Sequence, residues 1–227
     1  MNQRVIFRSE STLGQQCFEQ LQLEIINGTL KPGQKLKVGP IKERFAVGQS
    51  PVREALSRLV AFGLVEVEEN KGFRVCSISQ EDIRDTYATF TAIENMALAL
   101  AIEHGDDAWQ ANIVAELYKL SLIETKKNVD YTQWAERNYD FHVALIAGCG
   151  SPTLLEIRRN LYMKFDRYCR MAYQITKEDL VINHEEHKKL AQAVLAKDVR
   201  TAQKLMTHHI NDAIEDVIKQ FKQHDLI

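Results

Sequence analysis

Residues 49–75 read QSPVREALSRLVAFGLVEVEENKGFRV, and this stretch decides the fold of the N-terminal part of the chain. Ser50 is suited to cap a helix with Pro51 in its first turn, where a missing N–H costs nothing. Residues 64–68 then alternate apolar and acidic side chains, which is the period of a strand. Residues 73–75 form a second short strand after a glycine-containing turn. The stretch therefore predicts a helix followed by a β-hairpin.

The preceding residues extend this pattern toward the N-terminus. A helix is predicted over 13–27, and Gly28 ends it. Its apolar residues recur at helical spacing and comprise Cys17, Phe18, Leu21 and Ile25. A short helix is predicted over 40–46, with a tight turn at 47–49. Helix, helix, turn, helix and hairpin is the order of a winged helix-turn-helix, which we assign to residues 1–77.

The rest of the chain, residues 78–227, has no strand signals and almost no proline. Ser79 and Asp82 form a capping box that opens a long helix to about residue 104. Further helices are predicted over 107–127, 131–148, 152–175, 178–196 and 199–223. The fold class is therefore mostly α, with an N-terminal winged helix-turn-helix and a C-terminal antiparallel bundle of six to seven helices.

Composition narrows the class of protein. The net charge of −2 divides unevenly, because residues 1–75 hold eleven Lys/Arg and eight Asp/Glu, so the remainder is acidic. A basic N-terminal part joined to an acidic remainder fits a module that binds a polyanion. No stretch approaches the roughly 20 apolar residues of a membrane helix, and no signal peptide is recognisable. The four cysteines are scattered, so we expect reduced thiols and a cytoplasmic location.

The helix that begins near Ser50 carries a polar face. Gln49, Arg53 and Ser57 lie at i, i+4 and i+8 and therefore share one side. Guanidinium groups bind guanine, amides bind adenine, and hydroxyls bind either bases or phosphates. This face predicts double-stranded DNA as the partner. The alternative is an ordinary solvated helix face on which Arg53 pairs with Glu54 or Glu43.

The hairpin adds two further features. Lys71 at its tip is placed to reach a flanking phosphate, and Gly72 allows close approach of the backbone. The predicted DNA contacts are Arg44, Gln49, Ser50, Arg53, Ser57, Arg58, Lys71 and Gly72.

Several motifs in this region resemble the winged-helix signature of the GntR family. They are LKPGQKL at 30–36, SPVREAL at 50–56, Leu59, the Gly-Leu pair at 63–64, and Gly72, in order within residues 13–76. The resemblance implies a DNA-binding transcription regulator, usually a repressor, that binds a pseudo-palindromic operator as a homodimer. Arg53 matches the family's arginine. Gly48 and Gln49 stand where the family has serine and arginine, so base preference should differ at the corresponding operator position.

Three histidines of the helical part lie inside predicted helices beside apolar residues: His142, His187 and His209. Asn138 precedes His142 by one turn, so both project from the same face. Three histidines from three bundle helices could converge on one divalent cation, of which zinc or nickel would suit imidazole. Equally, each could be a core or surface histidine whose hydrogen bonds are satisfied within the protein.

The segments around these histidines resemble the all-helical, FCD-type sensor domain of the FadR subgroup. The matching stretches begin at Asn138, Glu186 and Asp198 and run to 146, 193 and 209. In that domain an aspartate and three histidines bind a metal that helps to hold a carboxylate effector. The resemblance implies that His142, His187 and His209 are ligands, with Asn138 in the place of the aspartate.

The effector is expected to be a small organic acid. Phe90 stands where the subgroup has an arginine one turn before Glu94, and with Tyr87 it forms an apolar line that suits an alkyl chain or simply the core. Arg167 and Arg170 are three residues apart and could clamp an anion instead. Segments 105–109, 147–151 and 193–198 resemble regulators of glutarate and related catabolism, which implies a glutarate-like acid.

Together these features predict a repressor whose operator affinity depends on an organic acid bound near a histidine-held metal. A regulator that responds to the metal alone is the alternative. A metal-dependent enzyme built on a helical bundle is disfavoured, because no glutamate stands three residues before any histidine. No phosphate-binding glycine loop or G-x-S-x-G nucleophile motif is present either.

Overall fold

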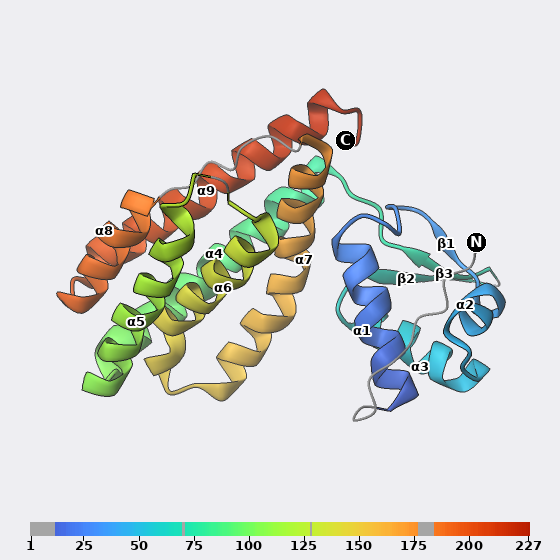
Figure 1. Cartoon of the computed structure of the whole chain (residues 1–227), viewed down its shortest axis with the longest axis horizontal. Helices are drawn as coiled ribbons and strands as arrows, with labels where there is room; N and C mark the ends of the chain where they lie inside the picture. Colours follow the sequence, from blue (N-terminus) through green and yellow to red (C-terminus); the bar gives the residue numbers. More distant parts are fainter. Residues whose placement is uncertain (1–11, 70, 128, 177–183) are drawn as a thin grey trace. The chain divides into compact units, whose positions relative to one another are not determined.

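The computed structural model describes residues 12–69, 71–127, 129–176 and 184–227. They divide into two compact units. The first unit contains the described residues up to Ile83 together with Asn160–Thr176 and Gln220–Ile227. The second contains Arg84–Arg159 and the described residues 184–219. Figure 1 shows the elements of both units. No helix in these described ranges is long and apolar enough to cross a membrane.

The first unit contains the winged helix-turn-helix that the sequence predicts. Its elements are α1 (Leu13–Ile26), β1 (Lys35–Leu36), α2 (Val38–Phe45), α3 (Gln49–Ala61), β2 (Val65–Glu68) and β3 (Gly72–Val75). The strands form an antiparallel sheet in the order β1-β3-β2, in which Arg74 pairs with Lys35 on one side and Glu66 on the other. The two-residue strand β1 was not predicted, because two residues are too few to show a period.

The core of this part lies between α1, α3 and the sheet. Leu21 and Ile25 from α1 and Leu56 and Leu59 from α3 are fully buried. Burial of each such side chain contributes about 1.5–3 kcal/mol, so the apolar stripes of the two helices hold them together. The opposite side of α3 is left in solvent.

Helix α3 begins two residues earlier than the sequence suggests. Ala46 adopts a left-handed conformation that ends α2, and Gly48 in extended conformation is the N-cap of α3. Ser50 is therefore a residue of the first turn and not the cap. The sequence prediction of a Ser50 cap is wrong, because the tight turn between the helices is completed at Gly48.

The remaining helices are α4 (Gln80–His104), α5 (Asp107–Glu124), α6 (Tyr131–Ile146), α7 (Pro152–Thr176), α8 (His184–Leu195) and α9 (Val199–Gln223), with a short 3-10 turn at Ala147–Cys149. Six long helices confirm the predicted bundle. Ser79 caps α4 as predicted, since its Oγ accepts from the Asp82 amide at 3.0 Å. The predicted helix start at residue 178 lies outside the described residues.

The turn between α4 and α5 is packed unusually closely. A methyl group on Gly105 would lie 2.0 Å from the Trp109 ring and 2.5 Å from the carbonyl oxygen of Ala101. The indole N–H of Trp109 donates to the carbonyl oxygen of Ala144 at 2.9 Å, which joins α5 to α6. Helix α5 also packs against α8, so its end lies beside the histidines described below.

Candidate DNA interface and metal centre

The outer face of α3 carries the predicted recognition residues. Gln49, Ser50, Arg53 and Ser57 are all exposed. With its amide oxygen toward the guanidinium, Gln49 accepts from Arg53 Nε at 3.0 Å and from Nη2 at 3.3 Å. Within the described part of the chain, Arg53 forms no ion pair with Glu43 or Glu54. The exposed guanidinium is therefore oriented by an amide and keeps its charge uncompensated.

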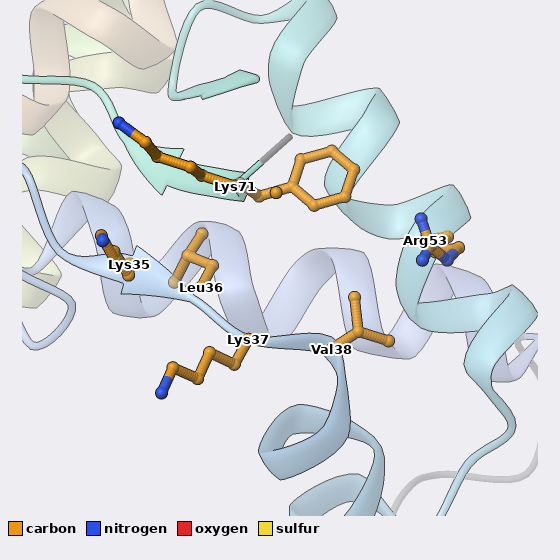
Figure 2. A pocket seen from close by; sticks show the side chains of 8 residues that line it. Lys35, Leu36, Lys37, Val38, Arg53 and Lys71 are labelled. Carbon is orange, nitrogen blue, oxygen red and sulfur yellow. The ribbon is translucent and has the colours of Figure 1, made fainter. Parts of the chain in front are cut away.

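A basic groove lies between α3 and the sheet. It is lined by Lys35, Leu36, Lys37, Val38, Arg53, Lys71, Gly72 and Phe73. Figure 2 shows Lys35 on β1, Lys37 just after that strand, and Arg53 on α3. Sequence reasoning missed Lys35 and Lys37, because β1 was not predicted and nothing else placed them beside the hairpin. Four cationic side chains along one groove suit the phosphates of a DNA backbone.

The other two predicted contacts, Arg44 and Arg58, are engaged within the domain. Arg44 pairs with Glu24 of α1 at 2.6 Å. Arg58 donates to the Gln15 side chain at 2.7 Å, and its guanidinium lies 4.1 Å from the Phe18 ring centroid. Both arginines thus hold α2 and α3 against α1, which is a structural use of their charge.

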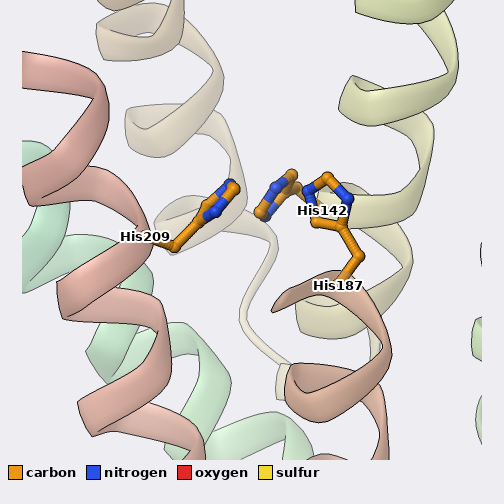
Figure 3. Close-up of side chains that lie close together, drawn as sticks. All are labelled: His142, His187 and His209. Atoms are coloured by element: carbon orange, nitrogen blue, oxygen red, sulfur yellow. The ribbon is translucent and has the colours of Figure 1, made fainter. Parts of the chain in front are cut away.

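The three histidines meet inside the second unit. His142 comes from α6, His187 from α8 and His209 from α9, and Figure 3 shows the rings turned toward one another. One nitrogen from each ring lies within 4.8 Å of the other two. His142 and His187 are buried and His209 is partly so. The prediction that these residues converge agrees with this geometry.

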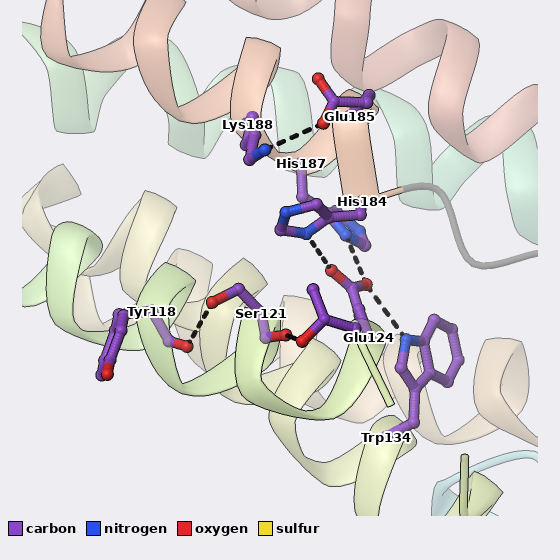
Figure 4. Close-up of polar contacts among 9 residues, drawn as sticks. Tyr118, Ser121, Glu124, Trp134, His184, Glu185, His187 and Lys188 are labelled. Atoms are coloured by element: carbon purple, nitrogen blue, oxygen red, sulfur yellow. Dashed lines mark hydrogen bonds and ion pairs between the residues drawn. The ribbon is translucent and has the colours of Figure 1, made fainter. Parts of the chain in front are cut away.

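In two of these rings the Nδ1 atom is hydrogen-bonded to a carboxylate. Glu124, the last residue of α5, lies 2.9 Å from His187 Nδ1 through Oε1 and 2.9 Å from His184 Nδ1 through Oε2 (Figure 4). Glu186 Oε2 lies 3.0 Å from His209 Nδ1. Neither glutamate was predicted from the sequence to belong to the site. Metal-binding histidines are commonly supported in this way, through the nitrogen that does not face the ion.

The polar atoms left over fit a cation. His187 Nε2 and Asn138 Oδ1 are buried and have no hydrogen-bond partner among the described residues. Burial lowers the pKa of His142 well below its usual value, and His209, His187 and Arg158 lower it further. Burial also lowers the pKa of His187, against the hydrogen bond to Glu124. Neutral imidazoles with free lone pairs are the form that binds a divalent metal.

Glu124 itself is ionised at neutral pH. Burial acts to raise its pKa, but the hydrogen bonds from His187, His184 and Trp134 outweigh that effect and leave the pKa below its usual value. The Trp134 indole N–H donates to Oε1 at 3.2 Å. The carboxylate is therefore available as an acceptor for all three donors.

Phe90, one of the two predicted effector residues of α4, lies beside a different arginine. Phe90 and Tyr87 are buried, and the Arg158 guanidinium of α7 is centred 5.3 Å from the Phe90 ring. Arg158 donates from Nε and Nη2 to one oxygen of Glu94, at 2.8 and 2.6 Å. An arginine from α7 thus stands over the ring that occupies the expected arginine position on α4.

Arg167 and Arg170 belong to the part of α7 in the first unit, whereas Phe90 and Tyr87 belong to the second. Arg167 is fully buried and donates to the carbonyl oxygen of Cys76 at 2.8 Å. Arg170 pairs with Asp166 at 2.7 Å. Their role as an anion clamp stays a prediction, and both guanidinium groups already have protein partners.

Comparisons with known proteins agree with this architecture. Residues 13–75 match the family model of bacterial regulatory proteins of the gntR family, and residues 85–212 match the FCD domain. The chain is 38% identical over 197 residues to the HTH-type transcriptional repressor GlaR of Escherichia coli, covering 84% of this chain and 89% of that protein. It is 36% identical over 208 residues to the HTH-type transcriptional regulator BphR of Paraburkholderia xenovorans, covering 90% and 84%. The solved structure of E. coli McbR/YncC superposes with a TM-score of 0.76 at 25% identity, covering 93% of this chain and 99% of that one.

Proposed function

Since the chain belongs to the gntR family of bacterial regulatory proteins and carries an FCD domain, we propose that this DNA-binding regulator is a repressor released by a small organic acid. The acid would bind beside a divalent metal held by His142, His187 and His209. The observation that carries the proposal is the convergence of these three imidazoles within 4.8 Å. We assign DNA binding to residues 1–77, and effector binding and dimerisation to residues 78–227.

Operator binding would use the exposed face of α3. Two copies of the chain would place their α3 helices in successive major grooves of a pseudo-palindromic site. Arg53, aligned by Gln49, is the residue suited to a guanine edge, while Ser50 and Ser57 offer hydroxyls beside it. The lysines of the basic groove, Lys35, Lys37 and Lys71, suit flanking phosphates.

Replacement of Arg53 by Ala tests this assignment. We expect operator binding to weaken by about 1–3 kcal/mol, because a base contact is lost. Arg137→Ala is the control, since Arg137 is an exposed sensor residue in an i,i+3 pair with Asp140. A gel shift in which both variants bind as tightly as the wild type would contradict the role of Arg53.

The metal would be held by His142, His187 and His209, with the Asn138 amide oxygen close by on α6. Imidazole nitrogens favour zinc, nickel or a similar ion. When bound, the ion supplies a Lewis-acidic position that a carboxylate can occupy. Asn138 is a weaker ligand than the aspartate usual in the subgroup, so a water molecule could share its place.

The histidine assignment predicts that His142→Ala abolishes bound metal while the folded protein still binds its operator. Metal content by mass spectrometry after dialysis gives the measurement. His104→Ala is the control, because His104 is an exposed histidine at the end of α4. Full metal occupancy of the His142 variant would refute the site.

The effector would be a small organic acid with an apolar portion. The buried rings of Phe90 and Tyr87 suit an alkyl chain, and Arg158 is the cation beside Phe90. A thermal-shift screen of small acids, glutarate among them, with added zinc or nickel would identify the class. An acid that stabilises the wild type but not His142→Ala supports a metal-dependent site.

One observation favours the alternative, a regulator that responds to the metal alone. Arg158 is already paired with Glu94, and both side chains are at most 2% exposed. Its charge is therefore balanced without a ligand. Operator affinity measured with metal-loaded and metal-stripped protein, without any acid, separates the two functions: only a metal sensor should change.

A further inference from the structure

Glu124 is the most completely enclosed carboxylate beside the histidines. It is the last residue of α5, and its side chain is 0% exposed. One carboxylate oxygen is hydrogen-bonded to His187 of α8 and to the indole N–H of Trp134 on α6. The other oxygen is hydrogen-bonded to His184 at the start of α8 (Figure 4). A single carboxylate thus connects the three helices α5, α6 and α8 beside His187, one histidine of the cluster.

The carboxylate fixes the position of one proton on each ring. A carboxylate accepts and does not donate, so each imidazole must carry a proton on the nitrogen that faces Glu124, which is Nδ1 in both His184 and His187. In the neutral ring of His187 the lone pair is then on Nε2. That is the buried atom for which the described residues supply no hydrogen-bond partner.

We propose that Glu124 is the positioning residue of the metal centre, which fixes the tautomer and ring orientation of His187 so that Nε2 faces the ion. This inference rests on the proposed metal function. Glu124 would not touch the ion. It would act through His187, while its contacts with His184 and Trp134 hold the carboxylate itself in place.

Glu124→Gln is the sharpest test, because it keeps the shape and changes the donor pattern. The amide has one acceptor oxygen for three N–H donors. Because the indole N–H of Trp134 can only donate, the oxygen stays with Trp134 and His187, and the NH₂ group faces His184, which has to move its proton to Nε2. We therefore expect His187 in Glu124→Gln to donate to a neutral amide in place of a carboxylate, which makes it a weaker metal ligand.

The tautomer can be measured without any metal. Long-range ¹H–¹⁵N spectra of metal-stripped, ¹⁵N-histidine-labelled full-length protein, assigned with His187→Gln, report which ring nitrogen carries the proton. We expect Nδ1–H for His187 in the wild type and in Glu124→Gln, and for His184 a proton that moves from Nδ1 to Nε2 in the variant. If wild-type His187 carries its proton on Nε2, the proposal is overturned even before a variant is made.

Metal affinity gives the second readout. Glu124→Gln should bind Zn²⁺ about 10–100-fold more weakly in competition with a chelator, as expected when the outer partner of a histidine ligand is removed. Glu116 lies on the same helix and pairs with the exposed Lys119. Glu116→Gln is therefore the control and should leave the Zn²⁺ affinity unchanged. Glu124→Asp keeps the charge but withdraws the carboxylate, so it should also weaken binding.

The outcomes separate the two proposals. Wild-type Zn²⁺ affinity in both Glu124 variants, with affinity lost in His142→Ala, would overturn the role of Glu124 and leave the metal site standing. Full Zn²⁺ binding in His142→Ala would overturn the metal site itself. In that case the spectra of the metal-stripped protein would still report whether Glu124 fixes the tautomer of His187.

Discussion

At the scale of single residues, Gln49 and Arg53 should act as one unit. Gln49 accepts from two nitrogens of Arg53, so loss of the amide frees the guanidinium to adopt other rotamers. We expect Gln49→Ala to weaken operator binding mainly in the presence of Arg53. A double-mutant cycle with Gln49→Ala and Arg53→Ala should then give a coupling energy of about 0.5 kcal/mol or more. Additive losses, together with a changed base preference in Gln49→Ala alone, would mean that Gln49 contacts a base directly.

Single residues also mark what the sequence could reveal about the site. The exposure of Arg53 and Ser57 was predictable, because their i,i+4 spacing puts them on one face of the helix and the apolar residues lie on the opposite, buried face. Glu124 was not, since it meets His187 through a sequence separation of 63 residues. No periodicity encodes such a contact. The same holds for Arg44 and Arg58, whose partners lie on α1.

At the scale of helices, the pair formed by Glu94 and Arg158 fastens α4 to α7. Both side chains are at most 2% exposed, so loss of the cation leaves a buried, uncompensated carboxylate. Arg158→Met should lower the free energy of unfolding by about 3–5 kcal/mol in urea denaturation, and Arg158→Met with Glu94→Leu should recover part of that loss. The exposed Arg137 offers the control, since Arg137→Met should cost at most about 1 kcal/mol. A double variant no more stable than Arg158→Met would argue against a buried-charge penalty.

The turn between α4 and α5 carries a second prediction at this scale. Gly105→Ala places a methyl group against Trp109 and the Ala101 carbonyl, so it should destabilise the protein by about 1–3 kcal/mol in thermal or urea unfolding. At Gly39 of α2, by contrast, no atom lies within 4 Å of the position that an added methyl group would occupy. Gly39→Ala should accordingly be neutral or stabilising by up to about 1 kcal/mol. Equal effects of the two replacements would show that the contact with Trp109 relaxes freely.

Helix boundaries show why the fold was easier to predict than its contacts. The segment 105–107 is recognisable as a break because glycine and aspartate interrupt the apolar period. That pattern says only that a helix ends, and the close approach of Trp109 depends on where α6 packs. Strand β1 escaped prediction for a related reason, because its two residues are defined by their partner β3 and not by a pattern of their own.

At the scale of the whole molecule, three helices contribute residues to both compact units: α4, α7 and α9. A ligand that shifts them in the second unit would therefore act on helices that continue into the first. If glutarate with Zn²⁺ lowers operator affinity by some factor, saturating operator must lower glutarate affinity by the same factor, because a coupling free energy is reciprocal. Calorimetric titration of glutarate into free and operator-bound protein measures this, with an expected factor of about 5–150. In His142→Ala the operator should still bind, and glutarate should no longer weaken it. Equal glutarate affinity in the free and operator-bound protein, alongside a glutarate-dependent loss of operator binding, would mean that the acid acts by withdrawing the metal and not by binding beside it.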